Sequence, residues 1–103
     1  SGVLITDHVV GSGALPIPGA TVKLVYTGML SDGTVVLSHQ KRTQPMVFRK
    51  GVNQVVKGLD QGLDTMRVGG SREITVPSAL GYGEAGYGSI PSNETLVFRV
   101  TLV

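Results

Sequence analysis

The order of hydrophobic and polar residues predicts strands in the first half of the chain. The run TVKLVYTGML (21–30) alternates, which places Val22, Leu24 and Tyr26 on one face and the residues between them on the other. An Asp-Gly turn in SDGT leads to TVVLS (34–38), so these two runs predict a β-hairpin. VLITDHVV (3–10) and PMVFRK (45–50) have the composition of two further strands.

After residue 54 the period of the apolar positions changes from two to between three and four. The positions that follow it are Val55, Val56, Leu59, Leu63 and Met66. Polar residues, including Asp60 and Asp64, fill the other side, so we predict one short amphipathic helix with both carboxylates in solvent. Gly58 and Gly62 cost this helix roughly 1 kcal/mol each relative to Ala. We therefore expect the helix to pack closely on a sheet at these two positions.

The last third of the chain predicts strands again. RVGG closes the helix, REITV (72–76) follows, and TLVFRVTLV (95–103) alternates with Leu96, Phe98 and Val100 on one face. The elements add up to a mostly antiparallel sheet whose apolar face is covered by a single helix, an α+β fold. A chain of 103 residues has room for one modest core, so we expect a single domain over 1–103.

Composition and charge narrow the class of protein. The net charge is +2, and the largest basic cluster, Lys41-Arg42 in HQKRTQ, is typical of a solvated loop, so we do not expect nucleic acid as a partner of this domain. The chain has no cysteine, which excludes disulfides and thiol catalysis. No apolar run approaches the roughly 20 residues that span a bilayer, so we expect no membrane contact.

Motifs for metal, nucleotide or acid-base chemistry are weak. His8 and His39 are far apart and have no further ligand at metal spacing, so we expect no metal site and two exposed histidines. GYGEAG (81–86) matches the glycine pattern of dinucleotide-binding loops. The residues after it contain Gly88 and Pro91 and cannot open a helix, so we expect no cofactor. An enzyme with this sequence has no obvious acid, base, nucleophile or metal.

Five segments together resemble one family of proteins. They are YTGML-SDGT (26–34), NQVVKGLDQGL (53–63), M-RVGG (66–70), LGYGEAGYGSIP (80–91) and TLVFRVTL (95–102). In this order and spacing they resemble the FK506-binding protein (FKBP) family of peptidyl-prolyl cis-trans isomerases, over nearly the whole chain. The resemblance implies a strongly bent antiparallel sheet of about five strands, wrapped around one short helix. It also implies isomerisation of X-Pro bonds, a reaction that breaks no covalent bond.

The resemblance implies a pocket for the proline ring and assigns roles to its residues. Leu59 is expected at the floor, Tyr26 and Phe98 as aromatic walls, and the hydroxyl of Tyr82 as a donor to a substrate carbonyl; these four form the expected catalytic set. The N–H of Val56 is expected to bind the other carbonyl, and carbonyls near Asn53 and Gln54 the substrate N–H groups. The remaining expected binding residues are Val36, Leu37, Met46, Val55, Tyr87 and Ile90. For Leu59 and Phe98 a role in the core is an equal alternative.

The sequence departs from the family's usual pattern at the pocket. Family members usually have Phe-Asp at the positions of Val36-Leu37. The best-known members have Trp at the position of Leu59 and Phe at that of Met46. Without the aspartate the pocket lacks a hydrogen-bond acceptor, and the smaller side chains make fewer contacts with a proline ring. We therefore expect weakened catalysis and a low affinity for macrolide immunosuppressants.

The expected partners follow from the same resemblance. They are proline-containing protein segments, bound by a monomer without a metal or cofactor. The alternative class is a non-catalytic binding or chaperone module that holds a proline-containing segment with the loops 39–44 and 81–91. The family alone favours a cytoplasmic or nuclear location.

Overall fold

The computed structural model describes residues 2–17, 19–41, 43–51, 56–88 and 90–103. Its elements are β1 (Leu4–Val9), β2 (Thr21–Leu30), β3 (Val35–His39), β4 (Met46–Arg49), α1 (Lys57–Gly62), β5 (Ser71–Val76), the 3₁₀ turn η1 (Ser78–Leu80) and β6 (Leu96–Leu102). Each strand-like run of the sequence forms a strand. No helix within the described ranges is long and apolar enough to cross a membrane.

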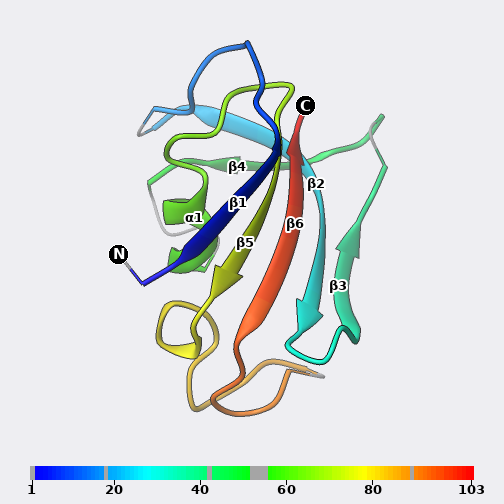
Figure 1. Ribbon diagram of the computed structural model, residues 1–103, viewed down its shortest axis with the longest axis vertical. Coiled ribbons are helices and arrows are strands. Elements are labelled where there is room, and N and C mark those ends of the chain that lie inside the picture. The colour runs from blue at the N-terminus through cyan, green and yellow to red at the C-terminus, as the bar shows by residue number, and fades with distance from the viewer. Residues whose placement is uncertain (1, 18, 42, 52–55, 89) are drawn as a thin grey trace.

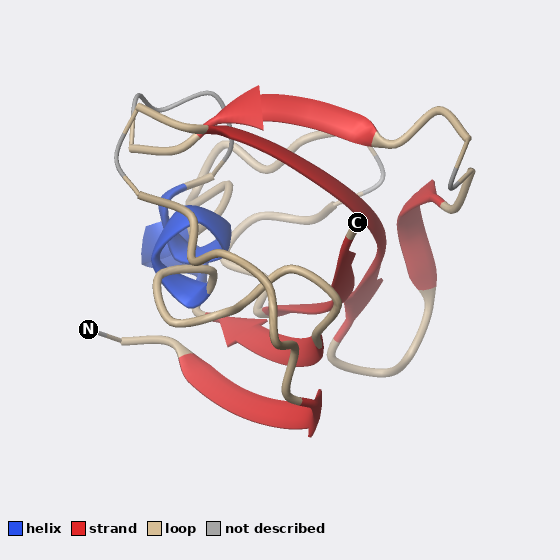
Figure 2. Ribbon diagram, turned by 90° about the horizontal axis from the view of Figure 1, so that it is seen from above, coloured by secondary structure: helices blue, strands red, loops and turns tan. Residues whose placement is uncertain are grey.

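The strands of the described chain form one antiparallel sheet of six strands, with the order β1-β5-β6-β2-β3 and with β4 also paired to β2. The long strand β2 pairs with β4 through Thr21–Leu24 and with β6 through Leu24–Leu30, so it passes from one part of the sheet to the other. Figures 1 and 2 show the sheet curling around α1. The predicted α+β fold is confirmed, with one strand more than the expected five.

The predicted hairpin is formed by β2 and β3, which pair from Tyr26 opposite His39 onward, with a shift of register between Gly28 and Met29. Its turn needs Gly33, whose φ of +92° lies in the left-handed region that favours glycine. The carboxylate of Asp32 accepts a hydrogen bond from the N–H of Thr34 at 2.9 Å. The Asp-Gly signal in the sequence therefore has the expected structural effect.

The helix is shorter than its apolar pattern predicts. α1 ends at Gly62, and beyond it the N–H groups of Leu63, Asp64 and Met66 bind carbonyls three residues earlier, which makes tight turns. The prediction of a helix reaching Met66 is wrong, because a periodic apolar pattern continues through such turns as well as through a helix. Leu63 and Met66 are still buried in the core.

The two helix glycines lie against the sheet, as expected. A Cβ atom on Gly58 would lie 2.3 Å from Cγ1 of Val76, and one on Gly62 would lie 2.6 Å from Cγ2 of Ile74. Both distances are far below van der Waals contact, so only glycine lets α1 approach β5 this closely. The cost in helix propensity is offset by this close packing on the sheet.

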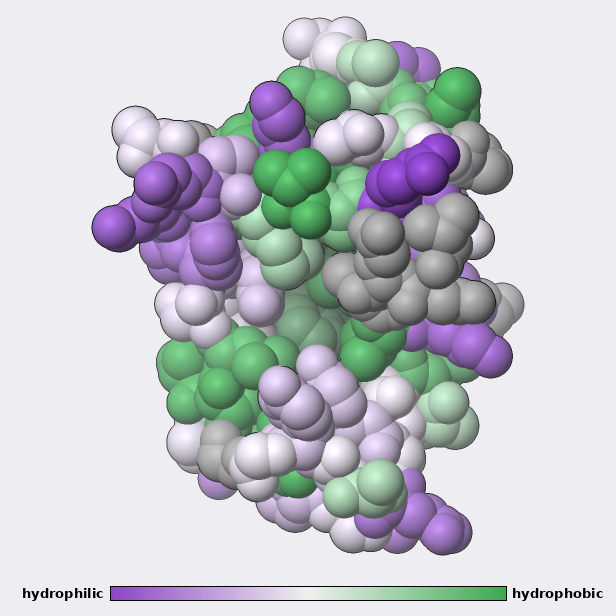
Figure 3. All heavy atoms as spheres, turned by 180° about the vertical axis from the view of Figure 1, so that it is seen from behind, coloured by the Kyte–Doolittle hydropathy of each residue, from purple (hydrophilic) through white to green (hydrophobic). Residues whose placement is uncertain are grey.

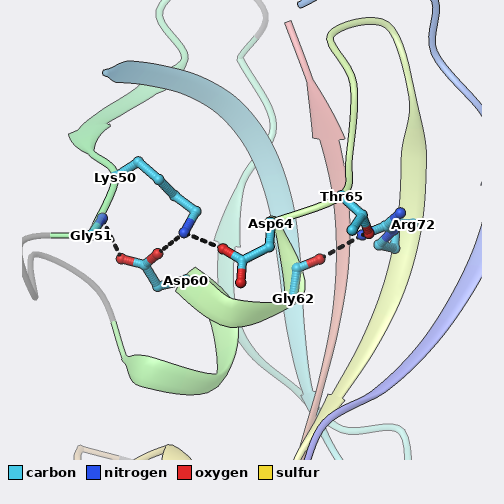
Figure 4. Close-up of polar contacts among 7 residues, drawn as sticks. All are labelled: Lys50, Gly51, Asp60, Gly62, Asp64, Thr65 and Arg72. Carbon is cyan, nitrogen blue, oxygen red and sulfur yellow. Dashed lines mark hydrogen bonds and ion pairs between the residues drawn. The ribbon is translucent and has the colours of Figure 1, made fainter. Parts of the chain in front are cut away.

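Two buried cations hold the C-terminal half of α1 and the turn that follows it (Figure 4). Lys50, 5% exposed, donates hydrogen bonds from Nζ to the carboxylates of Asp60 and Asp64. Arg72, also 5% exposed, donates to the carbonyl of Gly62 at 2.7 Å. The prediction that Asp60 lies in solvent is wrong: it is 9% exposed, because a cation from another element reaches it. Asp64 is exposed as predicted but is paired.

Candidate functional site

A cavity of about 180 Å³ lies between the sheet and α1. Its lining comes from four strands, from α1 and from the residues that flank α1 and η1. The lining residues are Tyr26, Leu37, Met46, Val56, Leu59, Tyr82 and Phe98. Figure 3 shows a hollow near the middle of one face, with hydrophobic side chains at its bottom. A wider hollow of about 310 Å³ lies over the sheet beside His8 and Arg99, and it has a more polar lining.

The bottom of the cavity is also part of the core. Leu59 is 3% exposed and Phe98 is 1% exposed, and both belong to the main cluster of buried side chains. The two interpretations of these residues, core and pocket, therefore do not compete, because one face of each side chain packs and another lines the cavity. The ring of Phe98 lies 6.2 Å from that of Tyr26 at an interplanar angle of 52°, a tilted aromatic pair.

Tyr26 has a second aromatic neighbour that the sequence did not indicate. Its ring stacks on the imidazole of His39 at 6.3 Å and 7°, because the two residues pair across the β2–β3 hairpin. The Nε2 atom of His39 is 2.6 Å from the carbonyl oxygen of Gln44. His39 is half-buried, so the prediction of two exposed histidines is right for His8 and wrong for His39. The hairpin register could have indicated this contact.

The glycine loop 81–88 presents two stacked tyrosines. The rings of Tyr82 and Tyr87 are 5.1 Å apart at 16°, and the N–H of Gly86 binds the carbonyl of Tyr82. Tyr82 lines the cavity, whereas Tyr87 is 61% exposed. Ile90 pairs its backbone with Tyr87 and is buried in the core. The structure therefore brings Tyr82 to the cavity, but not Tyr87 or Ile90.

The other expected binding residues differ in position. Val56 is half-buried, lines the cavity and directly precedes α1. Val36 packs against the core without lining the cavity. Gln54 and Val55 lie outside the described residues. The cavity thus gathers seven of the twelve expected site residues, whose roles stay predictions.

The lining suits an apolar ligand better than acid-base chemistry. Its described side chains are aliphatic or aromatic, and their only polar groups are the hydroxyls of Tyr26 and Tyr82. Burial raises the pKa of both tyrosines, so the hydroxyls stay protonated at neutral pH and can donate hydrogen bonds. No group of three or more His, Cys, Asp or Glu side chains in the described ranges could hold a metal ion.

Comparison with known proteins agrees with this geometry. The model of the FKBP-type peptidyl-prolyl cis-trans isomerase family matches residues 13–103. This chain belongs to that family. The FKBP chain is 42% identical to "FK506-binding protein" of Neisseria meningitidis serogroup B, over 99% of this chain and 94% of the relative. It is 48% identical to "FK506-binding protein 2" of Debaryomyces hansenii, over 84% of this chain and 64% of that relative's length.

A solved structure supports the same membership. The FKBP chain superposes on the crystal structure of AtFKBP13 with a TM-score of 0.90 and 35% identity, over 98% of this chain and 90% of that one. The resemblance inferred from the five sequence segments is therefore confirmed, together with the fold and the enzyme family. Four positions depart from the residues usual in the family. Three of them line the cavity, namely Leu37, Met46 and Leu59, whereas Val36 does not.

Proposed function

We propose that residues 1–103 act as one isomerase domain that catalyses cis-trans isomerisation of X-Pro bonds in protein segments. The observation that carries this proposal is the small apolar cavity with aromatic walls and no acid or base in its described lining. Rotation about an amide bond faces a barrier of about 18–20 kcal/mol that comes from resonance. The twisted transition state is less dipolar than the planar amide, so an apolar cavity shaped to it binds it preferentially.

The expected size of the effect is modest. A preference of about 4 kcal/mol for the transition state gives about a thousandfold acceleration. In this proposal the side chain of Leu59 lies beneath the proline ring, between Tyr26 and Phe98. The hydroxyl of Tyr82 and the N–H of Val56 hold the substrate carbonyls. Both residues line the cavity: Val56 directly precedes α1, and Tyr82 lies in the loop after η1.

We further propose that catalysis is weakened and that macrolide immunosuppressants bind poorly. Leu37 lines the cavity beside Tyr26 and cannot accept a hydrogen bond from it. Leu59 and Met46 offer less aromatic surface to a ring than the Trp and Phe of well-known relatives. The volume of about 180 Å³ is below the roughly 300–1,000 Å³ of sites for drug-sized ligands, which also favours a single ring over a macrolide.

Exchange spectroscopy by NMR on an Ala-Leu-Pro-Phe peptide tests this function. We expect the unmodified domain to accelerate cis-trans exchange, and the variant Leu37→Asp/Leu59→Trp to accelerate it about tenfold more. The matched control is Val35→Asp, because Val35 lies on the same strand, is 55% exposed and is not at the cavity. It should leave the rate unchanged. No acceleration by the unmodified domain, with activity only in the double variant, would overturn the proposal in favour of a binding module.

One observation favours that second function. Tyr87 is 61% exposed and stacks on Tyr82 at the rim of the cavity. Exposed aromatic surfaces bind proline-rich segments in other domains, because the extended conformation of such segments is already formed. A binding module therefore predicts that Tyr87→Ala weakens binding of a proline peptide while exchange stays at its uncatalysed rate.

A further inference from the structure

We propose that Lys50 is a positioning residue for the cavity: it fixes α1 to the end of β4 and thereby sets the distance between two cavity walls. This inference rests on the proposed function, because it concerns the walls that would hold the proline ring. Lys50 does not line the cavity. It acts through Asp60, which follows the lining residue Leu59 in the chain.

Lys50 itself is anchored by its backbone. It follows directly after β4, its N–H donates to the carbonyl of Ala20 at 2.9 Å, and its carbonyl accepts from the N–H of Gly19 at 2.7 Å. Its side chain then crosses to α1 and donates to Oδ1 of Asp60 and Oδ1 of Asp64 (Figure 4). One cation thus binds the carboxylate of Asp60 on α1 and that of Asp64 on the turn after it, which ties the C-terminal half of α1 to Lys50.

Asp60 connects this cation to the segment before the helix. Its Oδ2 atom accepts a hydrogen bond from the N–H of Gly51 at 3.0 Å, and its own N–H donates to the carbonyl of Val56 at 3.1 Å. The side chain of Asp60 therefore holds Gly51, and its backbone makes a helical hydrogen bond to Val56, the residue whose N–H we expect to bind a substrate carbonyl.

The two walls joined in this way belong to different elements. Met46 lies at the start of β4, the strand that ends next to Lys50. Val56 and Leu59 lie at the other wall, before and within α1. Lys50 and Gly51, which directly follow β4, both bind the carboxylate of Asp60 on α1 and so link these two elements.

The electrostatics fit positioning better than stabilisation. Burial lowers the pKa of Lys50, but the hydrogen bonds and charges of Asp60 and Asp64 outweigh burial, so its pKa is raised and it is charged at neutral pH. Replacing a buried ion pair by apolar side chains is often neutral for stability, because desolvation of the ions cancels their attraction. A directional hydrogen bond to Gly51, by contrast, has no apolar substitute.

The decisive variant removes both charges together. Lys50→Met alone leaves the carboxylate of Asp60 buried and uncompensated, which destabilises the fold for reasons unrelated to the site. Lys50→Met/Asp60→Leu keeps apolar volume and leaves Gly51, which is exposed, to bind water. We expect this double variant to keep its urea unfolding midpoint and to lose about tenfold in kcat/KM, mainly through KM. The matched control is Lys57→Met, an exposed lysine at the start of α1, which should change neither quantity.

A second readout is independent of catalysis. In the free protein we expect the methyl signal of Met46, which lines the cavity and adjoins no substituted residue, to shift in the double variant and not in Lys57→Met. If that signal and KM both stay unchanged while the fold is intact, Lys50 has no positioning role. If the unmodified protein catalyses no exchange, the proposed function fails, whereas the signal of Met46 still decides whether Lys50 sets the distance between the two walls.

Discussion

The core between the sheet and α1 has two parts: a sealed part, whose side chains do not border the cavity, and an open part, whose side chains do. The same elements contribute to both parts. Leu63 on the turn after α1, Ile74 on β5 and Leu96 on β6 are fully buried and do not line the cavity between the sheet and α1. Leu59 on α1 and Phe98 on β6 are nearly as buried, yet each borders the cavity of about 180 Å³. In the sealed part a side chain only stabilises the fold. In the open part it also shapes the cavity that we propose as the ligand site.

The largest effects should separate these two parts through one type of substitution. Leu63→Ala and Leu59→Ala each remove a buried leucine, so each should lower the free energy of unfolding by about 2–5 kcal/mol. Only Leu59→Ala should also lower kcat/KM, by about tenfold, because we propose Leu59 as the floor beneath the proline ring. Urea unfolding and exchange spectroscopy below the unfolding transition measure the two quantities. Equal losses of kcat/KM in the two variants would contradict the distinction between the sealed and the open part of the core.

The helix glycines sharpen the same comparison with smaller effects. Gly62→Ala should cost about 1–3 kcal/mol of stability through overpacking against Ile74, even though Ala gains roughly 1 kcal/mol in helix propensity. Gly58→Ala meets Val76 in the same way, but it adjoins Leu59 and should also raise KM. Thermal unfolding and KM measured on both variants check this. A gain in stability from either substitution would mean that α1 moves freely over β5.

The rim of the cavity offers a matched pair of hydroxyl groups. Tyr82→Phe keeps the ring stacked on Tyr87 and removes a hydroxyl at the cavity, so it should weaken substrate binding by about 0.5–1.5 kcal/mol. Tyr87→Phe removes the hydroxyl of a ring that is 61% exposed, so KM should stay the same. Peptide titration by NMR compares the two. If both variants or neither lose affinity, the hydroxyl of Tyr82 does not hold a carbonyl.

Much of the fold could be predicted from the sequence because its strongest signals are local. Alternation gives β2 and β6, Asp-Gly gives the hairpin turn, and two glycines four residues apart on an apolar helix indicate close packing on a sheet. The candidate lining followed from the family resemblance, since several short segments agreed in order and spacing. These signals need no knowledge of which distant residues meet.

The polar network could not be predicted in the same way. Asp60 follows the helical polar stripe, and that pattern is the same whether the stripe faces water or a buried cation. Lys50 belongs to a basic pair at the end of a strand, which is typical of a solvated loop end. Only the bend of the sheet brings Lys50 to α1. Side-chain contacts between residues that are distant in the chain produce no periodic pattern in the sequence.

The smallest expected effect concerns the stability of the fold at alkaline pH. The pKa values of Lys50, Tyr26 and Tyr82 are all raised in the folded protein, so above about pH 10 the unfolded chain loses these protons first. Stability should therefore hold up to about pH 10 and fall as the pH rises through the folded-state pKa values. Urea midpoints measured from pH 8 to 11 check the sign. The fall should be shallower in Lys50→Met/Asp60→Leu, which has lost one of the three groups, and unchanged in Lys57→Met. A steeper fall in the double variant would mean that the carboxylates do not hold the proton on Lys50.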